Sequence, residues 1–237
     1  MHLSDIIIVL SRPQESGNVG AVCRAMKNTG LSFLRIVDSE PLDSTQVRTR
    51  AVHAEDIWEH AEHFSDLPQA VQDCSLVVGT TRRRGAKRKS LNLNPLELAD
   101  SLRGRSGKTA LVFGNERSGL ENTELRSCTL TSFIPSAAAF PSLNLSHAVQ
   151  IYAYELFCAL GSEPVNSGRS ALDQQAIALV VRTISESLAL LGFYQQPGRE
   201  EQEEFLQDMI ARAGLSAREG KYLGDIFIKA VSLGLKR

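Results

Sequence analysis

Apolar runs of strand length recur through the first part of the chain, and stretches with helical spacing separate them. Residues 5–10, 33–37, 76–80 and 110–113 are almost continuously apolar. Such runs are typical of parallel strands that are covered on both faces. Strands that alternate with helices at this spacing predict an α/β fold built on a parallel sheet.

The first helix is predicted from Asn18, where apolar positions begin to fall on one face. Asn18 can cap this helix, and Gly30 stands where a helix end favours a left-handed residue. This places Arg24 on the helix, away from its apolar stripe. The spacing predicts further helices over residues 44–58, 67–74, 94–102 and 145–160. A short helix and one more strand are expected between residues 119 and 135.

The pattern changes after residue 161. Residues 162–169 are rich in Gly, Ser and Pro, which is typical of a linker. Beyond them no strand pattern occurs, and amphipathic helices are predicted over residues 172–191, 200–213 and 216–233. The last helix opens with a capping box formed by Ser216 and Glu219. We therefore predict an α/β domain over residues 1–161 and a small all-α extension over residues 170–237.

Composition limits the classes of protein to which the chain can belong. With 237 residues and 43% hydrophobic content, it can bury a sizeable core. The net charge of −1 excludes binding of nucleic acid by bulk charge but allows a local basic patch. No apolar run has the length of a membrane span and the first residues lack a basic leader, so a cytoplasmic protein is expected.

Common cofactor motifs are missing from the sequence. Neither GxGxxG nor GxxxxGK[ST] follows a strand, which argues against dinucleotide and P-loop enzymes. The GXXG at residues 17–20 is a chance match to RNA-binding KH domains, because its context is a parallel sheet. His60 and His63 are interpreted as surface residues, so no metal site is predicted. The four cysteines have no ligand spacing and are interpreted as reduced core thiols: Cys23, Cys74, Cys128 and Cys158.

Three polar stretches stand out, at residues 15–30, 113–120 and 134–146. Each has a simple structural explanation, such as Asn144 capping the following helix. Loops that follow parallel strands nevertheless collect ligands at the carboxyl edge of the sheet. The third stretch also contains small side chains, which let the backbone approach a ligand closely.

Together these stretches resemble the three motifs of the SpoU-type branch of the SPOUT superfamily. Its members are knotted RNA ribose 2′-O-methyltransferases that use S-adenosylmethionine. The resemblance covers residues 1 to about 160 and is greatest for the TrmJ-like group, to which the helical tail is more weakly similar. It implies a SPOUT fold with a C-terminal trefoil knot, an exception among protein chains. It also implies a homodimer, because a second subunit completes the site in this family.

The resemblance assigns roles to individual residues. The implied catalytic residues are Arg24, Asn18, Glu116, Ser142 and Asn144. The implied S-adenosylmethionine site comprises Thr80, Thr81, Arg82, Gly114, Ile134, Pro141, Ser142 and Leu143. A guanidinium stays protonated at ordinary pH, so we expect Arg24 to bind a phosphate and stabilise the developing alkoxide. Glu116 and Asn18 are expected to hold that guanidinium in place.

The expected substrate is RNA. Similarity to the TrmJ-like group implies tRNA methylated in its anticodon loop, giving Cm32 or Um32, and ribosomal RNA is the alternative. A dense basic run after the third strand is predicted to bind the RNA through Arg83, Arg84, Lys87 and Arg88. Arg48, Arg50 and the helical tail are expected to belong to the same RNA-binding surface. A knotted RNA-binding module without catalysis is an alternative of another class, which the complete set of motif residues disfavours.

Overall fold

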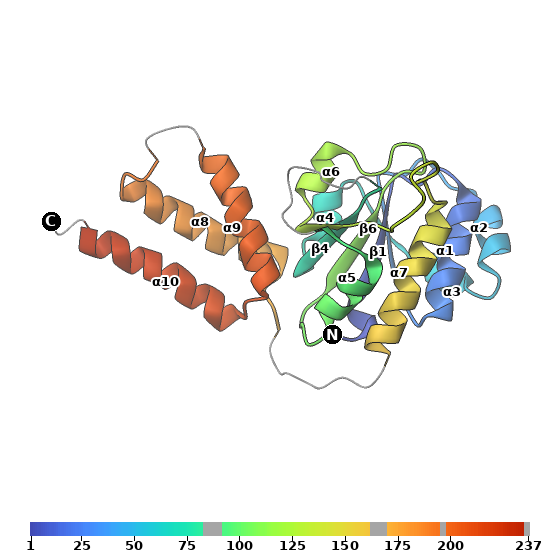
Figure 1. Ribbon diagram of the computed structural model, residues 1–237, viewed down its shortest axis with the longest axis horizontal. Helices are drawn as coiled ribbons and strands as arrows, with labels where there is room; N and C mark the ends of the chain where they lie inside the picture. Colours follow the sequence, from blue (N-terminus) through green and yellow to red (C-terminus); the bar gives the residue numbers. More distant parts are fainter. Residues whose placement is uncertain (83–91, 162–169, 195–197, 235–237) are drawn as a thin grey trace.

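The computed structural model describes residues 1–82, 92–161, 170–194 and 198–234. An α/β domain with a central sheet carries the N-terminus, and three helices at the other end of the molecule form the C-terminal tail (Figure 1). The predicted boundaries between these parts stay predictions, because residues 162–169 lie outside the described residues. None of the helices in the described ranges has the length and apolarity of a membrane span.

The sheet has seven strands in the order β3-β2-β1-β6-β4-β7-β5, and every pair of neighbours is parallel. The strands are β1 Ile6–Ser11, β2 Phe33–Val37, β3 Glu62–Phe64, β4 Leu76–Thr80, β5 Asn92–Leu93, β6 Thr109–Phe113 and β7 Leu130–Ser132. The central strands β1 and β6 are buried along their whole length, as continuous apolar runs require. The predicted parallel α/β sheet is confirmed. The knot stays an expectation from the resemblance.

Helices cover both faces of the sheet (Figure 1). They are η1 Leu3–Asp5, α1 Ser16–Asn28, α2 Ser44–Ala51, α3 Glu55–Glu59, α4 Leu67–Val71, α5 Pro95–Leu102, α6 Asn122–Arg126 and α7 Leu145–Leu160. Side chains of β1 alternate between two cores, with Ile6 and Ile8 in the larger core and Ile7 in the smaller one. The larger core packs against α1, α5 and α7, and the smaller one against α4.

The structure differs from the predictions at one helix and at one cysteine of this domain. The single helix expected over residues 44–58 is two helices, α2 and α3, because the backbone of Val52 and His53 is left-handed, with φ of 43° and 67°. A run of helical hydrogen bonds cannot pass through that conformation. Cys158 is exposed on α7, whereas the other three thiols are buried as predicted.

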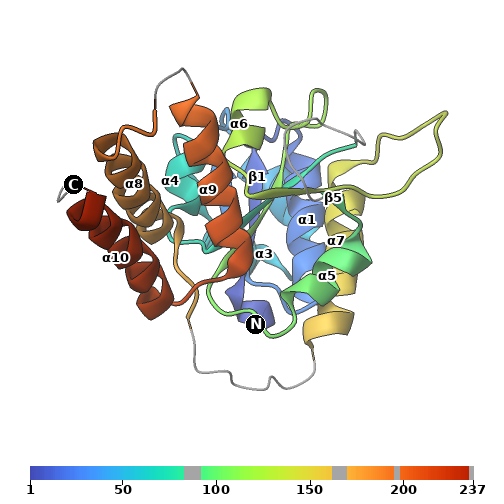
Figure 2. The same cartoon turned by 60° about the vertical axis from the view of Figure 1, so that its left-hand side comes forward.

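The tail consists of α8 Gln174–Leu190, α9 Arg199–Ala213 and α10 Ala217–Gly234, packed around a small apolar core of its own. The predicted capping box is confirmed, since Ser216 and Glu219 exchange hydrogen bonds at the start of α10. The tail lies against the sheet domain on the side of α4 (Figure 2). There the backbone N–H of Gln174 donates to the carbonyl of Cys74 at 2.9 Å.

Candidate active site

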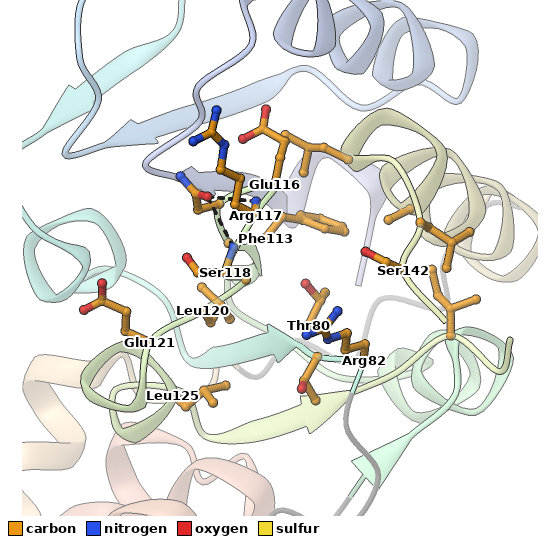
Figure 3. Close-up of a pocket in the computed structure, with 18 of the residues that line it drawn as sticks. Thr80, Arg82, Phe113, Glu116, Arg117, Ser118, Leu120, Glu121, Leu125 and Ser142 are labelled. Carbon is orange, nitrogen blue, oxygen red and sulfur yellow. Dashed lines mark hydrogen bonds between the residues drawn. The ribbon is translucent and has the colours of Figure 1, made fainter. Parts of the chain in front are cut away.

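A cavity of about 510 Å³ opens at the carboxyl ends of β4 and β6 (Figure 3). This volume lies within the roughly 300–1,000 Å³ that small-molecule sites occupy. Every residue of the implied S-adenosylmethionine site lines it: Thr80, Thr81, Arg82, Gly114, Ile134, Pro141, Ser142 and Leu143. Residues from three separate loops therefore converge on one cavity, although their roles stay predictions.

The loop after β6 forms one wall of the cavity, and its shape depends on Gly114. A Cβ atom at this position would lie 2.2 Å from backbone atoms of Gly119 and Leu120, so only glycine lets the loop fold back on itself. Asn115 fixes the turn, because its Oδ1 accepts from the backbone N–H of Arg117 at 2.9 Å and its Nδ2 donates to the carbonyl of Arg12 at 2.8 Å. The cavity wall is thus preformed.

Arg12 ties this wall to the end of β1. Its guanidinium donates to Glu121 at 2.5 Å and to Glu124 at 2.7 Å, at the start of α6. Glu124 also accepts from Ser11. Sequence reasoning missed this contact, because the partners lie more than 100 positions apart and no local pattern joins them.

Two buried aromatic rings are among the residues that line the cavity. Tyr152 of α7 lies against Phe113 with ring centroids 5.6 Å apart and rings nearly perpendicular. Its hydroxyl donates to Ser132 Oγ at 2.8 Å, and burial raises the pKa of the Tyr152 phenol. The ring thus lines the cavity as a buried, hydrogen-bonded aromatic wall. Sequence reasoning took α7 as scaffold and missed it.

A hydrogen-bonded chain of polar side chains runs along the cavity mouth. Glu116 accepts from the backbone N–H groups of Gln14 and Glu15, at 3.0 and 3.2 Å, and from Asn18 Nδ2 at 3.2 Å. Asn18 Oδ1 in turn accepts from Asn144 Nδ2 at 2.9 Å. Three of the five implied catalytic residues, one from each motif, are therefore directly connected.

The two asparagines have different local roles. The prediction that Asn18 caps its helix is wrong, since α1 begins at Ser16 and the Asn18 side chain faces Glu116 and Asn144. The prediction for Asn144 is confirmed, because its Oδ1 accepts from the backbone N–H of Ser146 at 2.9 Å at the start of α7. Ser142 lies across the cavity from the loop that carries Ser118 and Leu120 (Figure 3).

Arg24 stands apart from this chain of hydrogen bonds. It is exposed on α1, one turn beyond Ala21, and makes no hydrogen bond or ion pair with any residue in the described ranges. Within a single chain, the expected contacts of Arg24 with Glu116 and Asn18 are thus not formed. The four basic residues predicted to bind RNA, Arg83, Arg84, Lys87 and Arg88, lie outside the described residues. No cluster of metal-ligating side chains occurs within the described ranges.

A parallel sheet whose strand-end loops enclose a cavity has the architecture in which α/β proteins bind small organic ligands. Residues 5–154 match the SpoU rRNA Methylase family. The chain belongs to this family, and it is an RNA methyltransferase.

Relatives in bacteria and archaea support this assignment. The chain is 37% identical over 154 residues to the tRNA (cytidine-2′-O-)-methyltransferase TrmJ of Methanocaldococcus jannaschii, covering 64% of this chain and 67% of that protein. It is 33% identical over 224 residues to the tRNA (cytidine/uridine-2′-O-)-methyltransferase TrmJ of Pectobacterium atrosepticum, covering 92% of both chains. The crystal structure of TrmJ from Z. mobilis is 26% identical, with a TM-score of 0.73 over 94% of this chain and 98% of that one. The predicted resemblance to this group is confirmed.

Proposed function

We propose that the protein transfers the methyl group of S-adenosylmethionine to a ribose 2′-hydroxyl of tRNA. The observation that carries this proposal is the convergence of all eight implied cofactor residues on one cavity, beside the connected side chains of Asn18, Glu116 and Asn144. The relatives named above act on tRNA at cytidine or uridine ribose. An anticodon-loop pyrimidine, Cm32 or Um32, is the specific target we propose.

The cavity fits S-adenosylmethionine in chemistry as well as in volume. Ile134, Leu143 and Tyr152 supply apolar surface for an adenine ring, and Thr80 with the backbone around Gly114 supplies polar groups. When bound, S-adenosylmethionine supplies an electrophilic methyl group. The task of the chain is to hold the two reactants in line, which can lower the barrier by roughly 7–11 kcal/mol.

Arg24 is the cation that we assign to the RNA side of the reaction. Its guanidinium stays charged, so it binds the phosphate next to the target ribose and stabilises negative charge on the hydroxyl oxygen. Arg24 has no partner among the described residues, so residues of a second subunit can form contacts with its guanidinium. We propose a homodimer, and the exposed Tyr154 and Phe157 of α7 supply an apolar face for such a contact.

Ribosomal RNA is the second candidate substrate, because the family as a whole is named for it. The two candidates are separated by incubating the protein with tritiated S-adenosylmethionine and either tRNA or ribosomal RNA from a strain that lacks it. We expect label in tRNA, on a ribose that mapping places in the anticodon loop. Label in ribosomal RNA alone would move the assignment to the alternative. A non-catalytic module would give no label at all.

Replacement of Arg24 tests the catalytic assignment. We expect Arg24→Ala to lower methyl transfer by roughly 10²–10³-fold, the usual effect of losing one electrostatic donor in a transition state. Calorimetry should show unchanged affinity for S-adenosylmethionine, since Arg24 does not line the cavity. Lys27→Ala is the matched control, because Lys27 lies one turn further on α1 and pairs with Asp56 at 2.5 Å. Loss of both activity and cofactor binding would mean that Arg24 is structural.

A further inference from the structure

A second hollow, of about 500 Å³, lies next to the polar chain at the cavity mouth. It runs between α1, α2 and the start of α7, which lie side by side in the sheet domain (Figure 1). Asn18 and Asn144 form one side of this groove and are themselves joined by a hydrogen bond. The groove is thus continuous with the side chains that we place at the target ribose.

The opposite side of the groove is formed by Arg50 of α2. Two glycines of α1 let its side chain lie close to that helix. Its Cγ would be 3.7 Å from a Cβ atom at Gly17, and its Cβ would be only 2.8 Å from one at Gly20. The stem of Arg50 therefore lies along a strip of α1 that has no side chains, which directs the side chain along the groove.

No ion pair within the described part of the chain neutralises the charge of Arg50. Arg50 makes no hydrogen bond or ion pair with the residues that the structure describes, whereas Arg48, two positions earlier on α2, pairs with Glu59 at 3.3 Å. The other ionisable side chains on the groove are Glu15 and His147, and neither forms an ion pair with Arg50. An unpaired guanidinium beside two side-chain amides can bind a ligand that carries both an oxyanion and hydroxyl groups.

We propose that this groove binds the target nucleotide of the RNA, with Arg50 holding the phosphate on the 3′ side of the reacting ribose. The proposal rests on the proposed function. In RNA the 2′-hydroxyl and the 3′ oxygen, which carries the phosphate, are bonded to adjacent carbons of the ribose. A site that holds the 2′-hydroxyl next to the methyl donor must therefore also accommodate the 3′ phosphate. Phosphate contacts of this kind fix the register of a nucleic acid on a protein. Arg50 is a binding residue, separate from the catalytic role assigned to Arg24.

The test compares Arg50→Ala with Arg48→Ala, its matched control on the same helix. For Arg50→Ala we expect the KM for tRNA and the Kd for tRNA to rise roughly tenfold, the effect of losing one hydrogen bond to a charged group. The Kd for S-adenosylmethionine should not change. The slope of log Kd against log salt concentration should become shallower by about 0.7–0.9, the value for one phosphate contact. Arg48→Ala should behave as the wild type.

Two further variants test the chemistry of the contact. Arg50→Lys keeps the positive charge but cannot form bidentate hydrogen bonds with a phosphate. Its affinity for tRNA should therefore lie between those of the wild type and Arg50→Ala. Glu15→Gln removes the carboxylate from the groove and should tighten tRNA binding.

Each contrary outcome has a distinct meaning. Equal tRNA affinities for Arg50→Ala and Arg48→Ala would overturn the proposal. So would a change in oligomeric state of Arg50→Ala by size-exclusion chromatography with light scattering, because the groove would then be a contact between subunits. A wild-type protein that labels no RNA would contradict the proposed function instead. The tRNA-binding measurement separates the two cases, since it requires no turnover.

Discussion

Glu116 organises the polar side of the candidate active site because a single carboxylate accepts from two backbone N–H groups and one side-chain amide. Glu116→Ala leaves these donors without an acceptor. We expect it to lower the free energy of unfolding by about 1–2 kcal/mol and to reduce methyl transfer strongly. Urea unfolding and a tritium transfer assay measure the two effects. Arg117→Ala, at the exposed neighbouring position, should change stability by less than about 0.5 kcal/mol, and an equal loss there would contradict this role.

Asp73 makes stability depend on pH. The buried guanidinium of Arg35 donates to both of its carboxylate oxygens, at 2.6 and 3.0 Å, and Lys108 donates at 2.7 Å. The hydrogen bonds from Arg35 hold the pKa of the Asp73 carboxyl well below its usual range. Because the pKa is lower in the folded state than in the unfolded state, the pair stabilises the fold above about pH 4, and this contribution is lost as pH falls further.

The pH dependence is measured against Asp73→Asn, which cannot titrate at this position. We expect wild type to be the more stable protein at pH 7, and the difference in free energy of unfolding to shrink as pH falls below about 4. Urea unfolding at a series of pH values measures it. A difference that stays constant between pH 7 and pH 3 would mean that Asp73 does not stabilise the fold through its charge.

At the scale of elements, the contact between α1 and α2 depends on Gly20. A Cβ atom there would lie 2.2 Å from the carbonyl oxygen of Val47, so the two helices would have to separate. We expect Gly20→Ala to destabilise the protein by about 1–3 kcal/mol, the cost of overpacking. Gly17→Ala is the matched control: its Cβ would meet nothing closer than Arg50 Cγ at 3.7 Å, and alanine favours a helix. Thermal unfolding should separate the two variants, and equal melting temperatures would contradict the close contact.

The helices and strands that could be predicted from the sequence are those that the local pattern of apolar and polar residues determines without help from distant contacts. The strands β1, β2, β4 and β6 were predicted to within one residue, because a buried parallel strand is apolar at most of its positions. The short strands β3 and β5 were not predicted. Two of the three residues of β3, Glu62 and His63, are polar, and the segment is a strand because it pairs with β2. The break at Val52 likewise has no local signal, since a β-branched residue rarely adopts positive φ.

The same limit applies to the site. The eight cavity residues could be named because their motifs are contiguous in sequence and resemble those of a known family. Arg12, Asn115 and Tyr152 could not, because each acts through a partner distant in sequence or through burial. The groove with Arg50 also appears only when α1 and α2 are packed together. Motifs therefore identify residues that line the cavity, and folding identifies those that hold them in position.

At the scale of the whole molecule, the tail is held against the sheet domain by Arg105. This residue precedes β6, and its guanidinium donates to the carbonyls of Arg212 and Ala211 at 2.8 and 2.6 Å. These carbonyls belong to the last turn of α9, where a helix carries partial negative charge. Burial lowers the pKa of the Arg105 guanidinium, yet an arginine remains charged at neutral pH. Hydrogen bonds from a charged donor contribute about 1.5–3 kcal/mol each, so Arg105 is a major part of the docking contact.

Replacing Arg105 should therefore release the tail without unfolding either part. Arg105→Met keeps an apolar stem of similar length but removes both donors, so we expect a larger radius of gyration by small-angle X-ray scattering. Calorimetry should show unchanged affinity for S-adenosylmethionine, because Arg105 lies away from the cavity. Arg103→Met is the control. Arg103 is exposed, and among the described residues it pairs only with Asp100 of the same domain, at 3.1 Å.

If both variants scatter as the wild type does, the tail is held by its other contacts, such as that of Gln174 with Cys74. If Arg105→Met scatters differently and also binds tRNA less tightly, the docked position of the tail is part of the RNA-binding surface.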